Sequence, residues 1–214
     1  MKKGKYIVIE GGDGVGKTTQ LNLLLEWLQE QGVNCIWIEE PGGTPMAEAI
    51  RTILKDKTIE RHPETDALLF TAARADLRGV FAKLDTGAWV ISSRSYLTTI
   101  AFQGYGDGID VDKIKATTKM WMPDGYTTPD VEIVMSLDAK ASRERLQKRD
   151  LAAMQADTFE SKDLSFHDRA QQAYVKLGQE DGRYLVDADR SIEEIQKEIR
   201  EIVQPVLDDW QKSA

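Results

Sequence analysis

Cysteine is almost absent, since the 214 residues contain only Cys35. A single cysteine cannot form a disulfide within one chain, and a chain without disulfides is typical of a reducing compartment. The sequence also lacks a run of about 18 apolar residues, the length that crosses a bilayer as a helix. Its basic start, 1–5, is followed by an apolar stretch too short for a secretory signal. We therefore expect a soluble, cytoplasmic protein with no membrane partner.

Positive charge is also in short supply: 28 Lys and Arg residues stand against 36 Asp and Glu residues, a formal net charge of −8. No basic stripe and no interleaving of aromatic and basic residues offsets this acidity, which argues against a nucleic-acid partner. A phosphate-bearing small molecule remains compatible, because its site needs only a few local cations. The composition, 41% hydrophobic and 30% charged, is that of a globular protein. We expect residues 1–214 to form one domain.

What the sequence does have is a glycine-rich stretch near its start, GGDGVGKT at 11–18, which fits the phosphate-loop pattern G-x-x-x-x-G-K-[ST]. A short apolar run precedes it and leucines at helical spacing follow, the strand–loop–helix context that such a loop requires. Its glycines let backbone N–H groups approach an anion closely. Lys17 is suited to contact the β- and γ-phosphates, and the Thr18 hydroxyl to ligate Mg²⁺. The pattern predicts that the phosphates of a ligand bind at Gly11, Gly12, Asp13, Gly14, Val15, Gly16, Lys17, Thr18 and Thr19.

Short, mostly unbroken apolar runs recur along the chain and are typical of strands that are buried on both faces. They occupy 6–10, 35–39, 89–92, 131–137 and 184–186. Helical patterns fill the intervals at 18–31, 45–55, 65–84, 110–121, 141–148, 164–178 and 191–211. This alternation predicts an α/β fold, a five-stranded, mostly parallel sheet with helices on both faces. Ligands of such sheets bind at the carboxyl ends of the strands, so the residues that follow each strand are the functional candidates.

Several polar side chains follow these strands or lie on the next helix. Glu40 ends the second strand and is either a site carboxylate or a solvated loop residue. Arg51 is either a phosphate clamp or an ordinary surface arginine. Arg94, after the third strand, is a candidate for the same clamp. Phe70 and Arg74 are four residues apart and share a helix face. That face suits a flat heteroaromatic ring, or else a core phenylalanine beside a snorkelling arginine.

Two stretches further along the chain complete the candidate site. Gln103 is suited to read the edge of a base through its amide. Segment 143–163 begins with basic residues, including Arg143, Arg145 and Arg149, and then becomes irregular. It is either a solvated basic helix face or a lid that closes over phosphates and excludes water.

Taken in order, these segments resemble the thymidylate kinase family of P-loop nucleoside monophosphate kinases. The resemblance covers nearly the whole chain and rests on five ordered segments. They are GGDGVGKTT at 11–19, EPGGT at 40–44, the helix of Arg51, LLFTAAR at 68–74 and SRSYLTTIAFQG at 93–104. The resemblance implies phosphoryl transfer from ATP to thymidine monophosphate (dTMP), with Mg²⁺ as cofactor and thymidine diphosphate and ADP as products. It also implies a homodimer.

The resemblance assigns roles around the base and the sugar. Phe70 would stack on thymine, and Arg74, Thr99 and Gln103 would bind it. Phe102 matches an aromatic position that lies beneath the sugar and disfavours a ribose 2′-hydroxyl.

Other matching residues are assigned to the phosphates and the metal. Arg51 and Arg94 would grip the monophosphate, and Asp13 would contact the sugar 3′-hydroxyl. Glu40 would lie near the acceptor phosphate and, together with Thr18, near the metal.

The acceptor is already an anionic phosphate oxygen, so transfer requires alignment and charge neutralisation more than a strong base. Because the phosphate loop contains no arginine, the resemblance implies that the lid supplies one. Arg149 is the first candidate, and Arg143 or Arg145 the second. The expected catalytic residues are Lys17, Arg94, Asp13 and Arg149.

The sequence departs from the family pattern at several positions. Ser93 stands where an aspartate is usual, which implies weaker handling of Mg²⁺. Glu39 replaces a usual arginine, 150–163 contains no arginine, and Asp107 lies in a turn that is often basic. We expect a slower enzyme or a shifted acceptor preference. Two alternatives stay open: a kinase for another nucleoside monophosphate, modified pyrimidines included, or a nucleotide-binding regulatory protein that has lost transfer.

Overall fold

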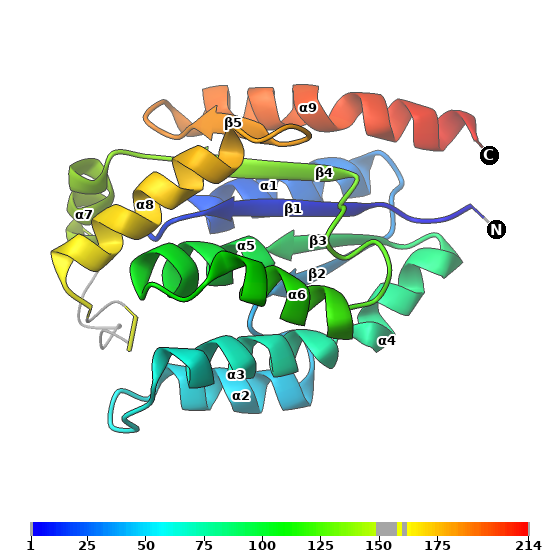
Figure 1. The fold of residues 1–214 in the computed structure, drawn as a ribbon. Coiled ribbons are helices and arrows are strands. Elements are labelled where there is room, and N and C mark those ends of the chain that lie inside the picture. The colour runs from blue at the N-terminus through cyan, green and yellow to red at the C-terminus, as the bar shows by residue number, and fades with distance from the viewer. Residues whose placement is uncertain (1, 149–157, 160–161, 214) are drawn as a thin grey trace.

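The computed structural model describes residues 2–148, 158–159 and 162–213, so Arg149 and much of the expected lid segment lie outside it. Within these described residues, five strands form one sheet, with helices packed around it (Figure 1). They are β1 (Tyr6–Gly11), β2 (Cys35–Glu39), β3 (Trp89–Ser93), β4 (Val131–Ser136) and β5 (Tyr184–Asp187). The strand order is β2-β3-β1-β4-β5, and every neighbouring pair is parallel. This confirms the predicted α/β fold.

Helices connect these strands along the chain. They are α1 (Lys17–Glu30), α2 (Pro45–Lys55), α3 (Pro63–Ala75), α4 (Arg78–Phe81), α5 (Tyr96–Thr99), α6 (Val111–Trp121), α7 (Ala139–Lys148), α8 (Leu164–Gly178) and α9 (Ile192–Lys212). In the part of the chain that the structure describes, none of them combines the length and the apolar character that a membrane-spanning helix needs.

The prediction of one continuous helix over 65–84 is wrong. Helix α3 ends at Ala75, α4 is a single turn, and a 3₁₀ helix occupies Ala82–Thr86. Asp76 and Gly79 are weak helix formers, and the Asp76 carboxylate accepts a hydrogen bond from the Thr44 hydroxyl. The chain therefore bends after α3 instead of continuing straight.

The sequence predicts no helix in 96–106, yet α5 and a π-helix, Ile100–Gly106, fill this stretch. Almost all of its side chains are buried, whether apolar or polar: Leu97 and Gln103 are both 0% exposed. A helix that is buried all round shows no amphipathic period, which is why the pattern did not reveal it.

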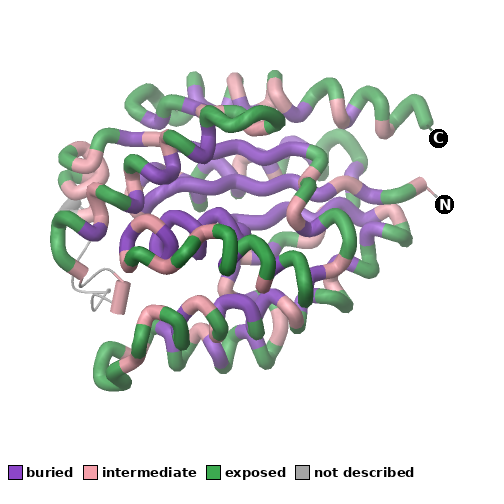
Figure 2. The backbone as a smooth tube through the Cα atoms, viewed as in Figure 1, coloured by how far each residue is buried: buried purple, intermediate pink, exposed green. Residues whose placement is uncertain are grey.

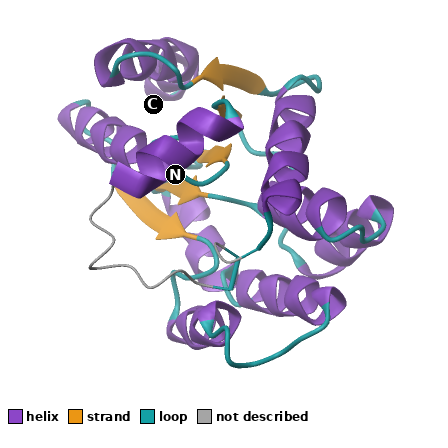
Figure 3. Ribbon diagram, turned by 90° about the vertical axis from the view of Figure 1, so that its left-hand side faces the viewer, coloured by secondary structure: helices purple, strands orange, loops and turns teal. Residues whose placement is uncertain are grey.

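Two hydrophobic layers fix helices to opposite faces of the sheet. On one face α1 and α9 pack through residues such as Leu24 and Ile199 against the side of β1 that bears Ile9. On the other face the π-helix and α8 pack through Phe102 and Tyr174. Figure 3 shows strands between helices on both sides, and Figure 2 shows buried inner strands beneath helices whose outer faces are exposed. Helices α2 and α3 pack on each other beside the β2 edge, where they form one wall of the site (Figure 1).

Candidate active site

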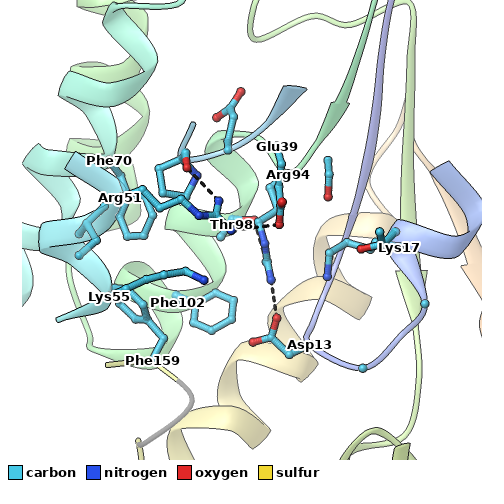
Figure 4. A pocket seen from close by; sticks show the side chains of 17 residues that line it. Asp13, Lys17, Glu39, Arg51, Lys55, Phe70, Arg94, Thr98, Phe102 and Phe159 are labelled. Carbon is cyan, nitrogen blue, oxygen red and sulfur yellow. Dashed lines mark hydrogen bonds and ion pairs between the residues drawn. The ribbon is translucent and has the colours of Figure 1, made fainter. Parts of the chain in front are cut away.

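A cavity lies at the carboxyl ends of β1, β2 and β3, where the phosphate loop faces α2, α3 and the π-helix. Lys17 lies on one side of it, the rings of Phe70 and Phe102 lie on the opposite side, and the Arg94 side chain lies between them (Figure 4). The lining therefore combines cationic groups with aromatic faces. These are the surfaces that a phosphate and a flat ring require.

The phosphate loop has the backbone that its glycines predict. Gly14 has φ 78°, and a Cβ there would come within 2.8 Å of the Ser142 carbonyl oxygen, so only glycine fits against α7. The Lys17 ammonium donates to the carbonyl oxygens of Gly11 and Gly12, at 2.9 Å and 2.7 Å. Burial, and then the charge of Arg94, lower the pKa of Lys17 to about 7. The loop thus holds Lys17 in surroundings that disfavour its positive charge, and a bound phosphate would supply the compensating negative charge.

Arg94 is positioned by an unusual backbone conformation at the end of β3. Its φ is 73°, in the left-handed region that non-glycine residues seldom adopt, and its N–H donates to the Ile9 carbonyl oxygen at 3.1 Å. The guanidinium forms an ion pair with Asp13. Burial opposes ionisation of Asp13, but Arg94 and then Lys17 lower the pKa of that carboxyl below its ordinary value. The structure therefore brings together three of the four expected catalytic residues, while Arg149 lies outside the described residues.

The turn that carries Arg94 is held by Glu10, which the sequence analysis did not select. Its carboxylate accepts hydrogen bonds from the N–H and hydroxyl of Ser95, at 2.5 Å and 2.8 Å. It also accepts from the N–H and hydroxyl of Thr98, at 3.2 Å and 2.8 Å. Because Thr98 gives its one proton to Glu10, the Tyr174 hydroxyl, 3.0 Å away, must donate to Thr98. The sequence held one signal for this role: Glu10 is a charged residue at the end of an apolar run.

Arg74 is held by three hydrogen bonds beneath the cavity. Its guanidinium donates to Glu40 Oε2, to the Thr99 hydroxyl and to the Ser95 carbonyl oxygen, each at 2.7 Å. The Tyr126 hydroxyl adds hydrogen bonds to both Glu40 oxygens, at 2.9 Å and 2.8 Å. Burial raises the pKa of Glu40 above its ordinary value, although Arg74 and Tyr126 oppose the shift. The predicted base-binding pair, Arg74 and Thr99, and the predicted phosphate-side Glu40 thus form one buried cluster.

Arg51 lies on the cavity wall and is bound to the carboxyl end of β2. Its Nη2 lies 3.2 Å from Glu39 Oε1, and its Nη1 donates to the Pro41 carbonyl oxygen at 2.9 Å. Both Arg51 and Glu39 line the cavity. The structure therefore places the predicted clamp arginines, Arg51 and Arg94, around one space.

The aromatic wall contains one ring that the sequence analysis did not select. Phe159 packs on Phe70 and on Phe102, with ring centroids 5.5 Å and 6.2 Å apart, and it lines the cavity with them. Gln103 is buried, and neither its amide nitrogen nor its amide oxygen has a partner among the described residues. A buried amide without hydrogen bonds is costly, but Gln103 is not among the residues that line the cavity.

Helix α7 joins the phosphate loop to the start of the expected lid. The Ser142 hydroxyl donates to the Asp13 carbonyl oxygen. Arg143 lies half-buried on the same helix, and Arg145 donates to the Ala188 carbonyl oxygen at 2.9 Å, which ties it to the loop after β5.

A wholly parallel sheet, a phosphate loop after β1 and a cationic, aromatic-lined cavity define the chain as a P-loop protein of the nucleoside monophosphate kinase type. Comparisons with known proteins give the family. The family model for thymidylate kinase matches residues 9–199. The chain belongs to the thymidylate kinase family.

Individual relatives match almost end to end. The chain is 35% identical over 213 residues to a thymidylate kinase of Nitrosomonas europaea, covering 98% of this chain and 96% of the relative. It is 37% identical to one of Halothermothrix orenii, with 92% and 95% covered. A Clavibacter michiganensis thymidylate kinase is 38% identical, with 95% and 96% covered.

Proposed function

We propose that this chain is an enzyme that transfers the γ-phosphoryl group of ATP to dTMP, giving thymidine diphosphate and ADP. Its family membership supports this reaction. One structural observation carries it: the phosphate-loop lysine, two arginines and an aromatic wall surround a single cavity. ATP phosphates bind at 11–19, and the acceptor occupies the space between Arg51, Arg94 and the rings.

The chain's residues act by alignment and charge neutralisation. Lys17 and the loop N–H groups hold the donor phosphates, while Arg51 and Arg94 hold the acceptor phosphate opposite them. Asp13 keeps Arg94 pointed at the cavity and lies where it can meet the sugar 3′-hydroxyl. A lid arginine, with Arg149 the first candidate, completes the neutralisation.

The base end of the acceptor meets a different set of side chains. Phe70 stacks on thymine and Phe102 lies beneath the sugar. Gln103 reads the base edge. Its buried amide nitrogen and oxygen have no hydrogen-bond partner among the described residues. Arg74 and Thr99 are bound to each other and are not among the residues that line the cavity, so their assignment to the base rests on the resemblance.

Mg²⁺ fits the chain as a nucleotide-bound ion. Among the residues that the structure describes, no three His, Cys, Asp or Glu side chains are grouped as a metal site. Such a group is not needed, because Mg²⁺ keeps several waters and binds phosphates with one or two protein oxygens. Thr18 is exposed on the cavity and is the proposed protein ligand; Glu40 is less suited, since both its oxygens are occupied. When bound, the ion neutralises charge on the donor phosphates.

We further propose a homodimer in the cytoplasm, one domain over 1–214, and a lid at 143–163 that closes over the phosphates. The single cysteine agrees with a reducing compartment. Sedimentation of the purified chain tests the dimer.

A coupled assay of ADP release, with ATP, Mg²⁺ and a panel of nucleoside monophosphates, tests the reaction. We expect turnover that is fastest with dTMP. Faster turnover with another monophosphate would keep the phosphoryl transfer and overturn the acceptor. ATP binding without turnover on any acceptor would favour the regulatory alternative, for which Glu39 and Ser93 are the supporting features.

A further inference from the structure

Among the described residues, two arginines line the cavity, and each is bound to a carboxylate of the chain itself. Arg94 is bound to Asp13 of the phosphate loop, and Arg51 is bound to Glu39 at the end of β2. Figure 4 shows both carboxylates beside the cavity, on different sides of it. Asp13 has a role in the proposed reaction, whereas Glu39 has none. Its negative charge lies where the acceptor's phosphate is expected to bind.

The geometry leaves Glu39 as the partner that an incoming anion displaces. The Arg51 guanidinium is fixed by the Pro41 carbonyl oxygen at 2.9 Å, a backbone contact that a ligand does not remove. Its second contact, to Glu39, is longer, at 3.2 Å, and the Glu39 side chain is 41% exposed. A guanidinium binds carboxylate and phosphate through the same fork of N–H groups. Glu39 and a bound phosphate therefore compete for one face of Arg51.

The residue opposite Glu39 on the neighbouring strand is neutral, although the charge of Glu39 also acts on Lys17 and Arg94, whose pKa values it raises. Glu39 is in register with Ser93 of β3, and both residues line the cavity. The Ser93 hydroxyl is neutral, so no charge on it redirects the carboxylate. Released from Arg51, the Glu39 carboxylate stays near the phosphate and repels it.

We propose that Glu39 is an internal competitor for the acceptor phosphate and thereby sets how strongly the site selects for that phosphate. This inference rests on the proposed function, because it takes the acceptor to be a nucleoside monophosphate. Binding of the monophosphate breaks the Arg51–Glu39 pair and leaves two negative groups close together. Both effects weaken binding of the phosphate and leave binding of the nucleoside part unchanged.

Calorimetric titration with dTMP and with thymidine, which lacks the phosphate, tests this role. We expect Glu39→Gln to bind dTMP about two- to fivefold more tightly, the range of a partly exposed ion pair. Thymidine affinity should not change, and the gain for dTMP should shrink at high salt. The control is Glu60→Gln, which removes the same charge from an exposed residue outside the cavity lining. It should leave both affinities unchanged.

A double-mutant cycle separates competition for Arg51 from simple repulsion. In an Arg51→Gln background, the competitor role predicts that Glu39→Gln loses most of its gain. An undiminished gain would show that Glu39 acts without Arg51 and would overturn the proposal. Weaker dTMP binding in Glu39→Gln would also overturn it, since Glu39 would then support binding. If Glu39→Gln binds dTMP as the unaltered chain does, only the competitor role fails; if the unaltered chain does not bind dTMP, the proposed function fails as well.

Discussion

Glu39 and Glu40 are neighbours in the sequence, yet their carboxylates have opposite surroundings. Glu40 is 1% exposed and is bound to Arg74 and Tyr126 beneath the cavity. The Glu39 side chain is 41% exposed and is bound to Arg51 at the cavity wall. Successive side chains at a strand end point in opposite directions, so one step along the chain separates a buried group from a ligand-facing one. The same pairing of carboxylate and guanidinium therefore stabilises the buried site in one place and lines the cavity wall in the other.

The energies of the two pairs differ for the same reason. In the buried Arg74–Glu40 pair, loss of one partner leaves a charge that water cannot reach, at a cost of about 3–5 kcal/mol. In the partly exposed Arg51–Glu39 pair, water solvates the remaining charge, and the pair is worth about 1 kcal/mol or less. Variants in the buried cluster should therefore change the stability of the fold, and variants on the cavity wall should change binding and turnover.

The largest expected effect is that of Arg74→Leu. We expect it to lower the free energy of unfolding by about 3–5 kcal/mol, because Glu40 stays buried without its cationic partner. Urea denaturation measures this loss. The matched control, Arg51→Leu, should lower the same quantity by about 1 kcal/mol or less. Equal losses in the two variants would remove the distinction between the buried and the exposed pair.

Arg94→Ala should give the opposite result, with the fold kept and turnover lost. Arg94 lines the cavity and carries charge opposite Lys17, and removal of one such group costs about 100- to 1,000-fold in kcat. The free energy of unfolding should fall by less than in Arg74→Leu, because the truncation removes the partly exposed ion pair with Asp13 but none of the contacts that Glu10 makes with Ser95 and Thr98. Steady-state kinetics and urea denaturation of one preparation measure both quantities. Retained turnover would show that Arg94 is not part of the reacting site.

Local patterns predicted the sheet and the phosphate loop, because apolar runs and a glycine-rich motif are readable over a few residues. The buried clusters were not predictable in this way. Arg74 and Phe70 are neighbours on a helix face, but Glu40 lies 34 positions before Arg74, and no spacing indicates that the two meet. Glu10 reaches Ser95 across 85 positions, through a strand order that the sequence does not state.

The resemblance supplied a different kind of information. It proposed which residues face the ligand, and the structure places Asp13, Arg51, Phe70, Arg94 and Phe102 on one cavity. It did not indicate that Glu39 would hold Arg51, because the family pattern has an arginine at that position. A departure from a pattern becomes informative only when the three-dimensional partner of the changed residue is known.

The smallest expected effect is proton uptake on nucleotide binding. It concerns Lys17 on the phosphate-loop side of the cavity, opposite the wall that carries Arg51 and Glu39. Burial lowers the pKa of Lys17 to about 7 in the ligand-free protein, so at pH 8 this lysine is mostly neutral. Bound phosphate favours the ammonium form and raises that pKa. ADP binding at pH 8 should therefore take up close to one proton, about 0.5–1, and affinity should fall as pH rises above 7.

Calorimetry of ADP binding in two buffers of different ionisation enthalpy measures this uptake. The control is Lys17→Arg, because a guanidinium stays protonated throughout this range and has no proton to gain. ADP phosphates are themselves fully ionised at pH 8, so they add no uptake of their own. Equal uptake by the two proteins would mean that the proton goes to another group, and that the cavity does not hold Lys17 in its neutral form before nucleotide binds.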